Sequence, residues 1–125
     1  TAAIDRHPVT GESPNPLRHV VFVRRDLPFG LQMANVVHAA GESSPGGLLP
    51  GTYAVCLHAQ DEAELKLITR KLRDAKIDFR AVCEPEPPHN GALMAIGIVP
   101  VRAHSSERYT LNRILSSLPL AKEAK

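Results

Sequence analysis

His38 and Asn35 are the two residues of this chain whose types and spacing best suit acid–base chemistry. They stand three positions apart in an otherwise apolar segment, residues 31–40, so they project from one face of a predicted helix. An imidazole exchanges a proton near neutral pH and can act as a general base, and a carboxamide can donate to a developing oxyanion. A histidine packed in the core is an equally common use of such a position.

Two carboxylates, Glu84 and Glu86, lie in a proline-rich segment after a predicted strand. Alternation in an extended chain points both to one side, where repulsion between like charges can produce a general base. Solvated loop charges are the commoner explanation of such a pair. Cys83 precedes them, and a hydrolase with a cysteine nucleophile is a weaker alternative, because free cysteines usually pack in apolar surroundings.

Ten of the fifteen cationic residues are arginines, whose planar guanidinium suits phosphate groups. Lys66, Arg70 and Arg73 stand at i, i+4 and i+7 of a predicted helix and form one basic stripe, although a solvated helix face is the commoner explanation. Phosphates bound there would give salt-sensitive, sequence-independent affinity for a nucleic-acid backbone. The net charge of +2 does not by itself indicate a class of binding partner, and the sequence has no glycine-rich phosphate-binding loop.

Alternating strands and helices must position these residues. The predicted strands are short runs of β-branched and apolar residues, and the predicted helices show apolar spacing of about 3.6 residues. Their order predicts an α/β fold, a three-layer sandwich in which a four-stranded mixed sheet has helices on both faces. The predicted strands cover residues 19–24, 52–59, 78–83 and 92–100, and the predicted helices cover 31–40, 60–76 and a last segment capped by Ser105 or Ser106.

The chain length of 125 residues fits one domain. Three prolines and a lack of apolar periodicity predict a flexible N-terminal tail over residues 1–17, followed by a domain over 18–120 and a C-terminal tail over 121–125. No apolar stretch approaches the roughly 20 residues of a membrane-spanning helix, and two cysteines without a secretory signal indicate the cytoplasm. The histidines show no metal-ligand spacing, so we expect no metal or other cofactor.

Three segments, residues 23–40, 62–86 and 93–100, resemble the archaeal and eukaryotic type of peptidyl-tRNA hydrolase. The family's Val-Arg-x-Asp-Leu strand end is matched at Val23, Arg24, Asp26 and Leu27. Its Gln-x-x-His-Ala helix motif reads Asn35-Val36-Val37-His38-Ala39. The likeness extends over roughly residues 18–120.

The resemblance implies hydrolysis of the ester that joins a peptide or aminoacyl group to the terminal ribose of tRNA. It implies catalytic roles for His38, Asn35 and one glutamate, Glu84 or Glu86. The expected partner is tRNA or peptidyl-tRNA, no membrane partner is expected, and a homodimer stays open. Together with the basic stripe, the resemblance proposes these substrate-binding residues: Arg24, Asp26, Lys66, Arg70 and Arg73.

The chain also departs from the family's pattern. The family's lysine, four residues before the motif glutamine, falls on Leu31, and that glutamine is replaced by Asn35, which is one methylene shorter. The family's Thr-Asp-Ala-Gly-Arg-Thr-Gln loop is replaced by the proline-rich residues 84–91. These changes favour weak or altered activity. The alternatives are a catalytically silent relative that binds tRNA, another RNA or a protein, and a small-molecule module using a cleft between His38 and Glu86.

Overall fold

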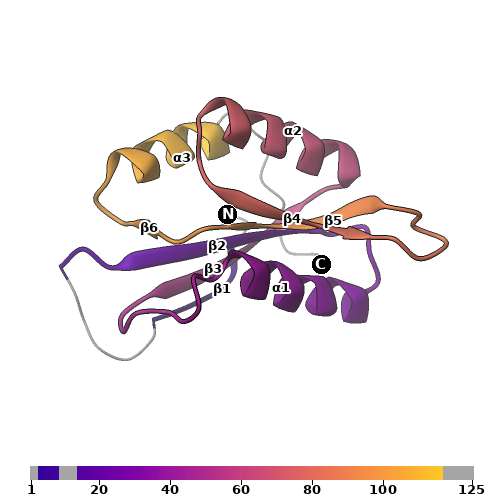
Figure 1. The fold of residues 1–125 in the computed structure, drawn as a ribbon, viewed down its shortest axis with the longest axis horizontal. Helices are drawn as coiled ribbons and strands as arrows, with labels where there is room; N and C mark the ends of the chain where they lie inside the picture. Colours follow the sequence, from indigo (N-terminus) through magenta and orange to yellow (C-terminus); the bar gives the residue numbers. More distant parts are fainter. Residues whose placement is uncertain (1–2, 9–13, 117–125) are drawn as a thin grey trace.

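The computed structural model describes residues 3–8 and 14–116 as an α/β sandwich, with helices on both faces of a mixed sheet (Figure 1). The predicted fold class is therefore confirmed, but the sheet has six strands rather than the four expected. The elements in chain order are β1 (Ala3–Pro8), β2 (Leu17–Arg24), α1 (Phe29–Ser43), β3 (Tyr53–Ala59), α2 (Glu62–Asp74), β4 (Phe79–Glu84), β5 (Ala92–Ile98), β6 (Val101–Arg102) and α3 (Ser106–Ser116).

The strand order is β1-β3-β2-β5-β4, and β6 pairs with the beginning of β2. β2 runs parallel to β3, with Val20 opposite Val55, as expected for strands joined through the crossover helix α1. β2 runs antiparallel to β5, with Phe22 opposite Ile96, and β5 runs antiparallel to β4. β2 therefore lies in the middle of the sheet, and β4 lies at one edge.

The N-terminal segment differs from its prediction. Residues 3–8, expected in a flexible tail, form β1 and pair antiparallel with β3, with Pro8 opposite Tyr53. Pairing at the edge of a sheet requires main-chain hydrogen bonds rather than apolar alternation, so the composition contained no signal for this strand. The predicted C-terminal tail, residues 121–125, lies outside the described residues.

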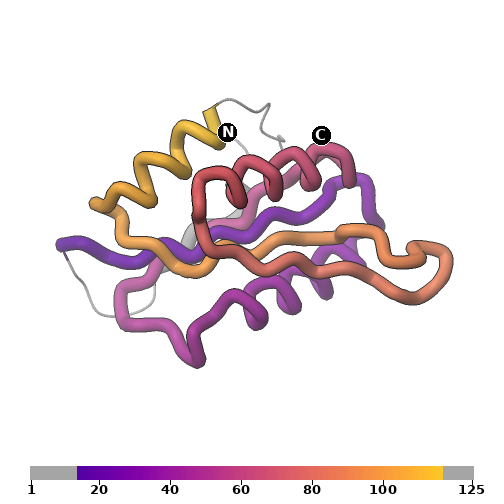
Figure 2. The backbone as a smooth tube through the Cα atoms, turned by 45° about the horizontal axis from the view of Figure 1, so that its top comes forward, coloured from indigo at the N-terminus to yellow at the C-terminus, as the bar shows by residue number. Residues whose placement is uncertain are grey.

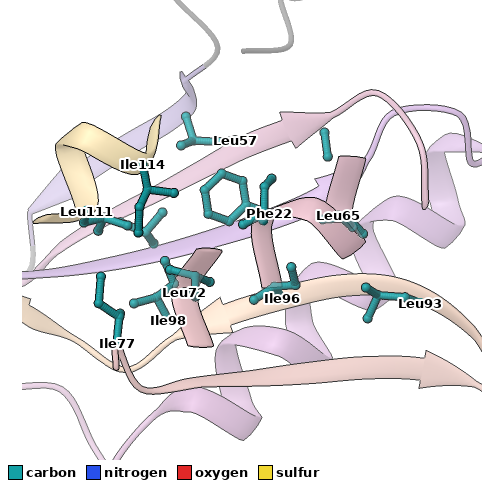
Figure 3. Packing of buried hydrophobic residues seen from close by; sticks show 13 residues of the cluster. Phe22, Leu57, Leu65, Leu72, Ile77, Leu93, Ile96, Ile98, Leu111 and Ile114 are labelled. Atoms are coloured by element: carbon teal, nitrogen blue, oxygen red, sulfur yellow. The ribbon is translucent and has the colours of Figure 1, made fainter. Parts of the chain in front are cut away.

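The two faces of the sheet carry separate apolar layers. Val20 and Phe22 of β2 point toward α2 and α3 and belong to the larger cluster, shown in Figure 3. Val21 and Val23 alternate to the other face and pack with Ala39 of α1. In Figure 1, α1 accordingly lies on one side of the sheet and α2 and α3 lie on the other.

α2 begins where the sequence predicts a capped helix. Oδ1 of Asp61 accepts the main-chain N–H of Glu64 at 2.9 Å, and the Glu64 side chain accepts the N–H of Gln60 at 2.7 Å. The first bond satisfies one of the N–H groups that a helix start leaves unpaired, and the second ties the residue before the N-cap to the first turn. The helix then buries Leu65 and Leu72 and turns its charged side toward solvent.

α1 packs unusually close to β5. A side chain at Gly97 would clash with the main-chain oxygen of Ala39 and the hydroxyl of Ser43, so only hydrogen fits at this position. Ser43 donates to Ala39 O at 2.7 Å, and Nε2 of the buried His19 lies 2.7 Å from the same hydroxyl. Because the single proton of Ser43 is already donated, Nε2 of His19 carries a hydrogen and donates. These contacts hold α1 at a fixed height above the sheet.

Candidate functional site

A hollow of about 360 Å³ lies between α1 and β4. Three polar side chains of α1 line it, Asn35, His38 and Glu42, because their spacing of three and four residues places them on one helix face. Residues 81–85, at the end of β4 and just beyond it, form the opposite wall. Two segments that are distant in the sequence therefore meet here.

Asn35 is held rigidly in this wall. The residue is only 4% exposed, and its Nδ2 donates to the main-chain oxygen of Leu31 at 2.9 Å. A carboxamide nitrogen carries two hydrogens, so the second N–H is available to a ligand. Leu31 lies one helical turn before Asn35 on the same side of α1.

His38 is exposed at the rim of the hollow. Within the described part of the chain, its imidazole makes no hydrogen bond that would fix the ring. Glu42 follows one turn later and lines the same hollow. The imidazole is thus free to meet a ligand or water.

The structure distinguishes the two glutamates that the sequence left open. Glu84 is half-buried and lines the hollow, whereas Glu86 is exposed and is not part of its wall. Oε1 of Glu84 accepts the main-chain N–H of Glu86 at 3.0 Å, and its main-chain oxygen accepts the N–H of Gly91 at 2.6 Å. These bonds close the loop between β4 and β5 and fix the Glu84 carboxylate beside α1. Glu86, which the sequence analysis placed in a cleft with His38, is not among the residues that line this hollow.

Cys83 also lines the hollow and is exposed, contrary to the expectation that it packs in the core. At the bulge between Val82 and Cys83 the register shifts by one residue, which disturbs the strict alternation of faces along β4. The thiol therefore shares the hollow with His38. This position is compatible with a cysteine nucleophile, and the Cys83→Ala variant distinguishes attack by the thiol from attack by water.

Arg24 and Asp26, proposed as substrate-binding residues, bind each other. Nε and Nη2 of Arg24 donate to the two carboxylate oxygens of Asp26 at 2.9 and 2.8 Å, a two-point ion pair. The hydrogen bond from Arg24 is the main cause of the lowered pKa of Asp26. Nη1 of Arg24 also donates to the main-chain oxygen of Leu93 at 3.2 Å, and Glu62 accepts the N–H of Leu93 at 2.8 Å. These contacts join the ends of β2, β5 and α2.

The basic stripe lies on the opposite face of the sheet from the hollow. Lys66, Arg70 and Arg73 belong to α2, which packs on the face away from α1 (Figure 1). Lys66 lies 3.7 Å from Glu62, and the guanidinium of Arg73 lies 5.8 Å from the centroid of the Phe79 ring. The sequence could not place the stripe, because the side on which a helix packs depends on the strand order.

The sequence analysis did not identify a polar pair formed by the buried Gln32 and the half-buried His58. Nε2 of Gln32 donates to the main-chain oxygen of Leu27 at 2.8 Å, and its Oε1 lies 2.8 Å from Nε2 of His58. An amide oxygen only accepts, so Nε2 of His58 donates, and its buried Nδ1 has no partner among the described residues. The only sequence signal was a glutamine on the buried side of an apolar helix. The pair connects the beginning of α1 to β3.

Burial makes stability depend on pH through two histidines. Burial lowers the pKa of His19. The pKa of His58 is also lowered, mainly by burial and to a smaller extent by the positive charge of Arg25. Below about pH 6.5 the unfolded chain binds protons that the folded chain rejects, so stability falls as the pH falls. We expect the free energy of unfolding to decrease as the pH falls below that value, with the buried His19 contributing more than the half-exposed His58.

Urea unfolding at pH 7.5 and pH 5.5 measures this effect. The lowered pKa values of Asp26 and Glu62 remove stability only near and below pH 4, so that range separates the two effects. His19→Gln should flatten the dependence, whereas the control His104→Gln, at an exposed site, should leave it unchanged. If the wild type had the same urea midpoint at both pH values, the two histidines could not be the cause of a pH-dependent stability.

Among the described residues, no three His, Cys, Asp or Glu side chains are grouped so that they could bind a metal ion. None of the described helices combines the length and the apolar character needed to cross a membrane. No protein-family model matches the sequence, and neither does any curated protein.

Proposed function

We propose that the protein hydrolyses the ester between a peptide or aminoacyl group and the terminal ribose of tRNA, at the hollow between α1 and β4. The observation that carries the proposal is that His38, Asn35 and Glu84 line one hollow, although the glutamate is distant from the other two in sequence. A base, an N–H donor and a carboxylate are the groups that ester hydrolysis by water requires. The sequence around these residues resembles that of peptidyl-tRNA hydrolases, and for this reason we propose the tRNA ester as the substrate.

In this mechanism, neutral His38 removes a proton from a water molecule as that water attacks the ester carbonyl. The free N–H of Asn35 donates to the oxyanion that forms on the carbonyl oxygen. The ester C–O bond then breaks, and the imidazolium returns its proton to the departing ribose oxygen. The products are the free carboxylic acid and a tRNA with both terminal hydroxyls.

Glu84 positions the reactants. Its Oε1 accepts the N–H of Glu86, so Oε2 remains to accept a hydrogen bond from the attacking water or a ribose hydroxyl. The stiff, proline-rich loop keeps that oxygen in place, and correct positioning is worth large factors in rate. Leu31 supplies no positive charge where the family has a lysine, so transition-state stabilisation is weaker here and turnover should be slow.

The test follows ester loss from N-acetyl-aminoacyl-tRNA with purified protein. Wild type should release the acyl group, and Glu84→Gln should slow the release by about tenfold to a hundredfold. Glu86→Gln is the matched control, because it removes a carboxylate two residues away that lies outside the hollow, and it should change the rate less than twofold. Equal losses in both variants would reject the assignment of Glu84, and absence of turnover in wild type would reject hydrolysis.

A second candidate is a non-catalytic RNA-binding protein. It is favoured by the basic stripe, Lys66, Arg70 and Arg73, whose exposed side chains lie on the face away from the hollow. Three neutralised phosphates predict that tRNA affinity falls roughly 20- to 40-fold between 50 and 200 mM salt. Fluorescence anisotropy with labelled tRNA measures it. Replacing the three cations by glutamine should remove most of this dependence, whereas Arg113→Gln on α3 should retain it.

A further inference from the structure

β4 is an edge strand with main-chain groups available for pairing. The strand order places it at the end of the sheet, and none of the described strands other than β5 pairs with it. In Figure 2 the hairpin of β4 and β5 extends past the neighbouring strands. Such an edge can accept another extended chain through hydrogen bonds that do not depend on side chains.

The ladder with β5 shows which groups face outward. The N–H of Val99 donates to the main-chain oxygen of Asp78 at 3.1 Å, and Arg80 lies opposite Gly97 two residues later. Alternation in an antiparallel ladder therefore turns the N–H and C=O groups of Phe79 and Ala81 away from β5. In agreement, the Phe79 oxygen accepts a hydrogen bond from Nη1 of Arg80 at 2.9 Å. Ala81 is exposed and small, so its outward groups are sterically accessible.

This edge leads directly into the hollow. Ala81 and Val82 belong both to β4 and to the wall that faces His38. The register shift between Val82 and Cys83 lies within the part of β4 that lines the hollow, and pairing with β5 continues beyond it through Glu84. Bulges often occur at such junctions between a strand and a site.

We propose that an extended peptide docks along β4 as an additional strand, with the ester at its carboxyl end in the hollow. The inference rests on the proposed function and names how the peptide part of the substrate is recognised. Because the carboxyl end must reach the end of β4, the peptide runs parallel to it. Main-chain pairing accepts any peptide sequence, as a hydrolase acting on many different peptide esters requires.

The length of the peptide should control the rate. Phe79–Val82 offers regular pairing to about four peptide residues, so the ratio kcat/KM should rise with peptide length and level off near four residues. Each main-chain hydrogen bond gained contributes about a fivefold increase. The measurement compares N-acetyl-aminoacyl-tRNA with N-acetyl-dipeptidyl-, tripeptidyl- and tetrapeptidyl-tRNA. An ester-for-amide replacement in the peptide main chain, which removes one N–H donor, should lower the tetrapeptide rate.

Two variants of one residue test the edge itself. Ala81→Pro removes the outward N–H, and proline is tolerated on the free side of an edge strand. Ala81→Val keeps that N–H and the strand conformation. The rate ratio between tetrapeptidyl and aminoacyl substrates should fall about fivefold in Ala81→Pro and stay near the wild-type value in Ala81→Val. Circular dichroism and thermal melts establish that both variants fold.

Hydrogen exchange separates failure of docking from failure of hydrolysis. A free N-acetyl tetrapeptide amide should slow exchange of the Ala81 N–H, whether or not the protein hydrolyses tRNA esters. Absence of this protection, or a rate independent of peptide length, would overturn the docking proposal. Protection without any hydrolysis would overturn the proposed function and leave peptide docking standing. A concentration-dependent dimer abolished by Ala81→Pro would assign the edge to a second copy and overturn docking.

Discussion

Replacement of His38 by alanine is expected to lower the rate of ester hydrolysis by about 10²- to 10⁴-fold. That range is the usual contribution of a positioned general base, and none of the other histidines in the described part of the chain lines the hollow. The substrate KM should change little, because His38 lies at the rim and, in the proposed mechanism, interacts with the attacking water rather than with the tRNA. Single-turnover ester loss from N-acetyl-aminoacyl-tRNA gives the rate of the chemical step.

Three further measurements test whether the loss of rate in His38→Ala is due to the missing imidazole. Added imidazole should restore part of the rate of His38→Ala, because a small base can enter an open hollow and take over proton transfer. His104→Ala, at an exposed position outside the hollow, should behave as wild type. Cys83→Ala should retain activity if water is the nucleophile. A dead Cys83→Ala variant that still folds would instead assign the attack to the thiol.

Gly97→Ala is expected to destabilise the fold by about 3 kcal/mol or more. The added methyl group would collide with the main-chain oxygen of Ala39, which the helix holds in place, and with Ser43. Overpacking of a rigid site costs roughly 1–3 kcal/mol, and backbone has less freedom to move than a side chain. Since β5 is buried along its length, relaxation would have to displace α1, and with it the Asn35 and His38 wall of the hollow.

Gly41→Ala is the matched control for that substitution. A side chain at Gly41 would meet nothing within 4 Å, so alanine there should stabilise the helix by about 0.5–1 kcal/mol. Urea unfolding of both variants measures the difference. A Gly97→Ala variant with wild-type stability would show that α1 can move away from β5 without loss.

Much of the fold could be predicted because local patterns determine it. The buried strand β5 follows from the apolar run ALMAIGI, and the beginning of α2 follows from Asp61 and Glu64 at capping positions. The predicted helix over residues 31–40 is part of α1, which extends from Phe29 to Ser43 because it continues through Gly30 and Gly41. These signals lie within a few residues of one another in the chain.

The relations between distant segments could not be predicted in the same way. Glu84 and Glu86 have equivalent local sequence environments, and only the closure of the loop onto Gly91 places Glu84 in the wall of the hollow. The opposition between the hollow and the basic stripe follows from the strand order, which the sequence pattern does not specify. β1 has no apolar pattern because an edge strand needs only main-chain partners.

The central proposal is that the hollow between α1 and β4 receives the acylated end of tRNA. The most direct test is a chemical-shift titration of the labelled protein with a stable mimic, an adenosine whose 3′ position carries an N-acetyl-aminoacyl group through an amide. We predict shifts confined to the main-chain N–H groups of Asn35, His38 and Glu84 and their neighbours in α1 and β4. Shifts confined to α2 around Arg70, or no shifts at saturating mimic, would contradict the proposal.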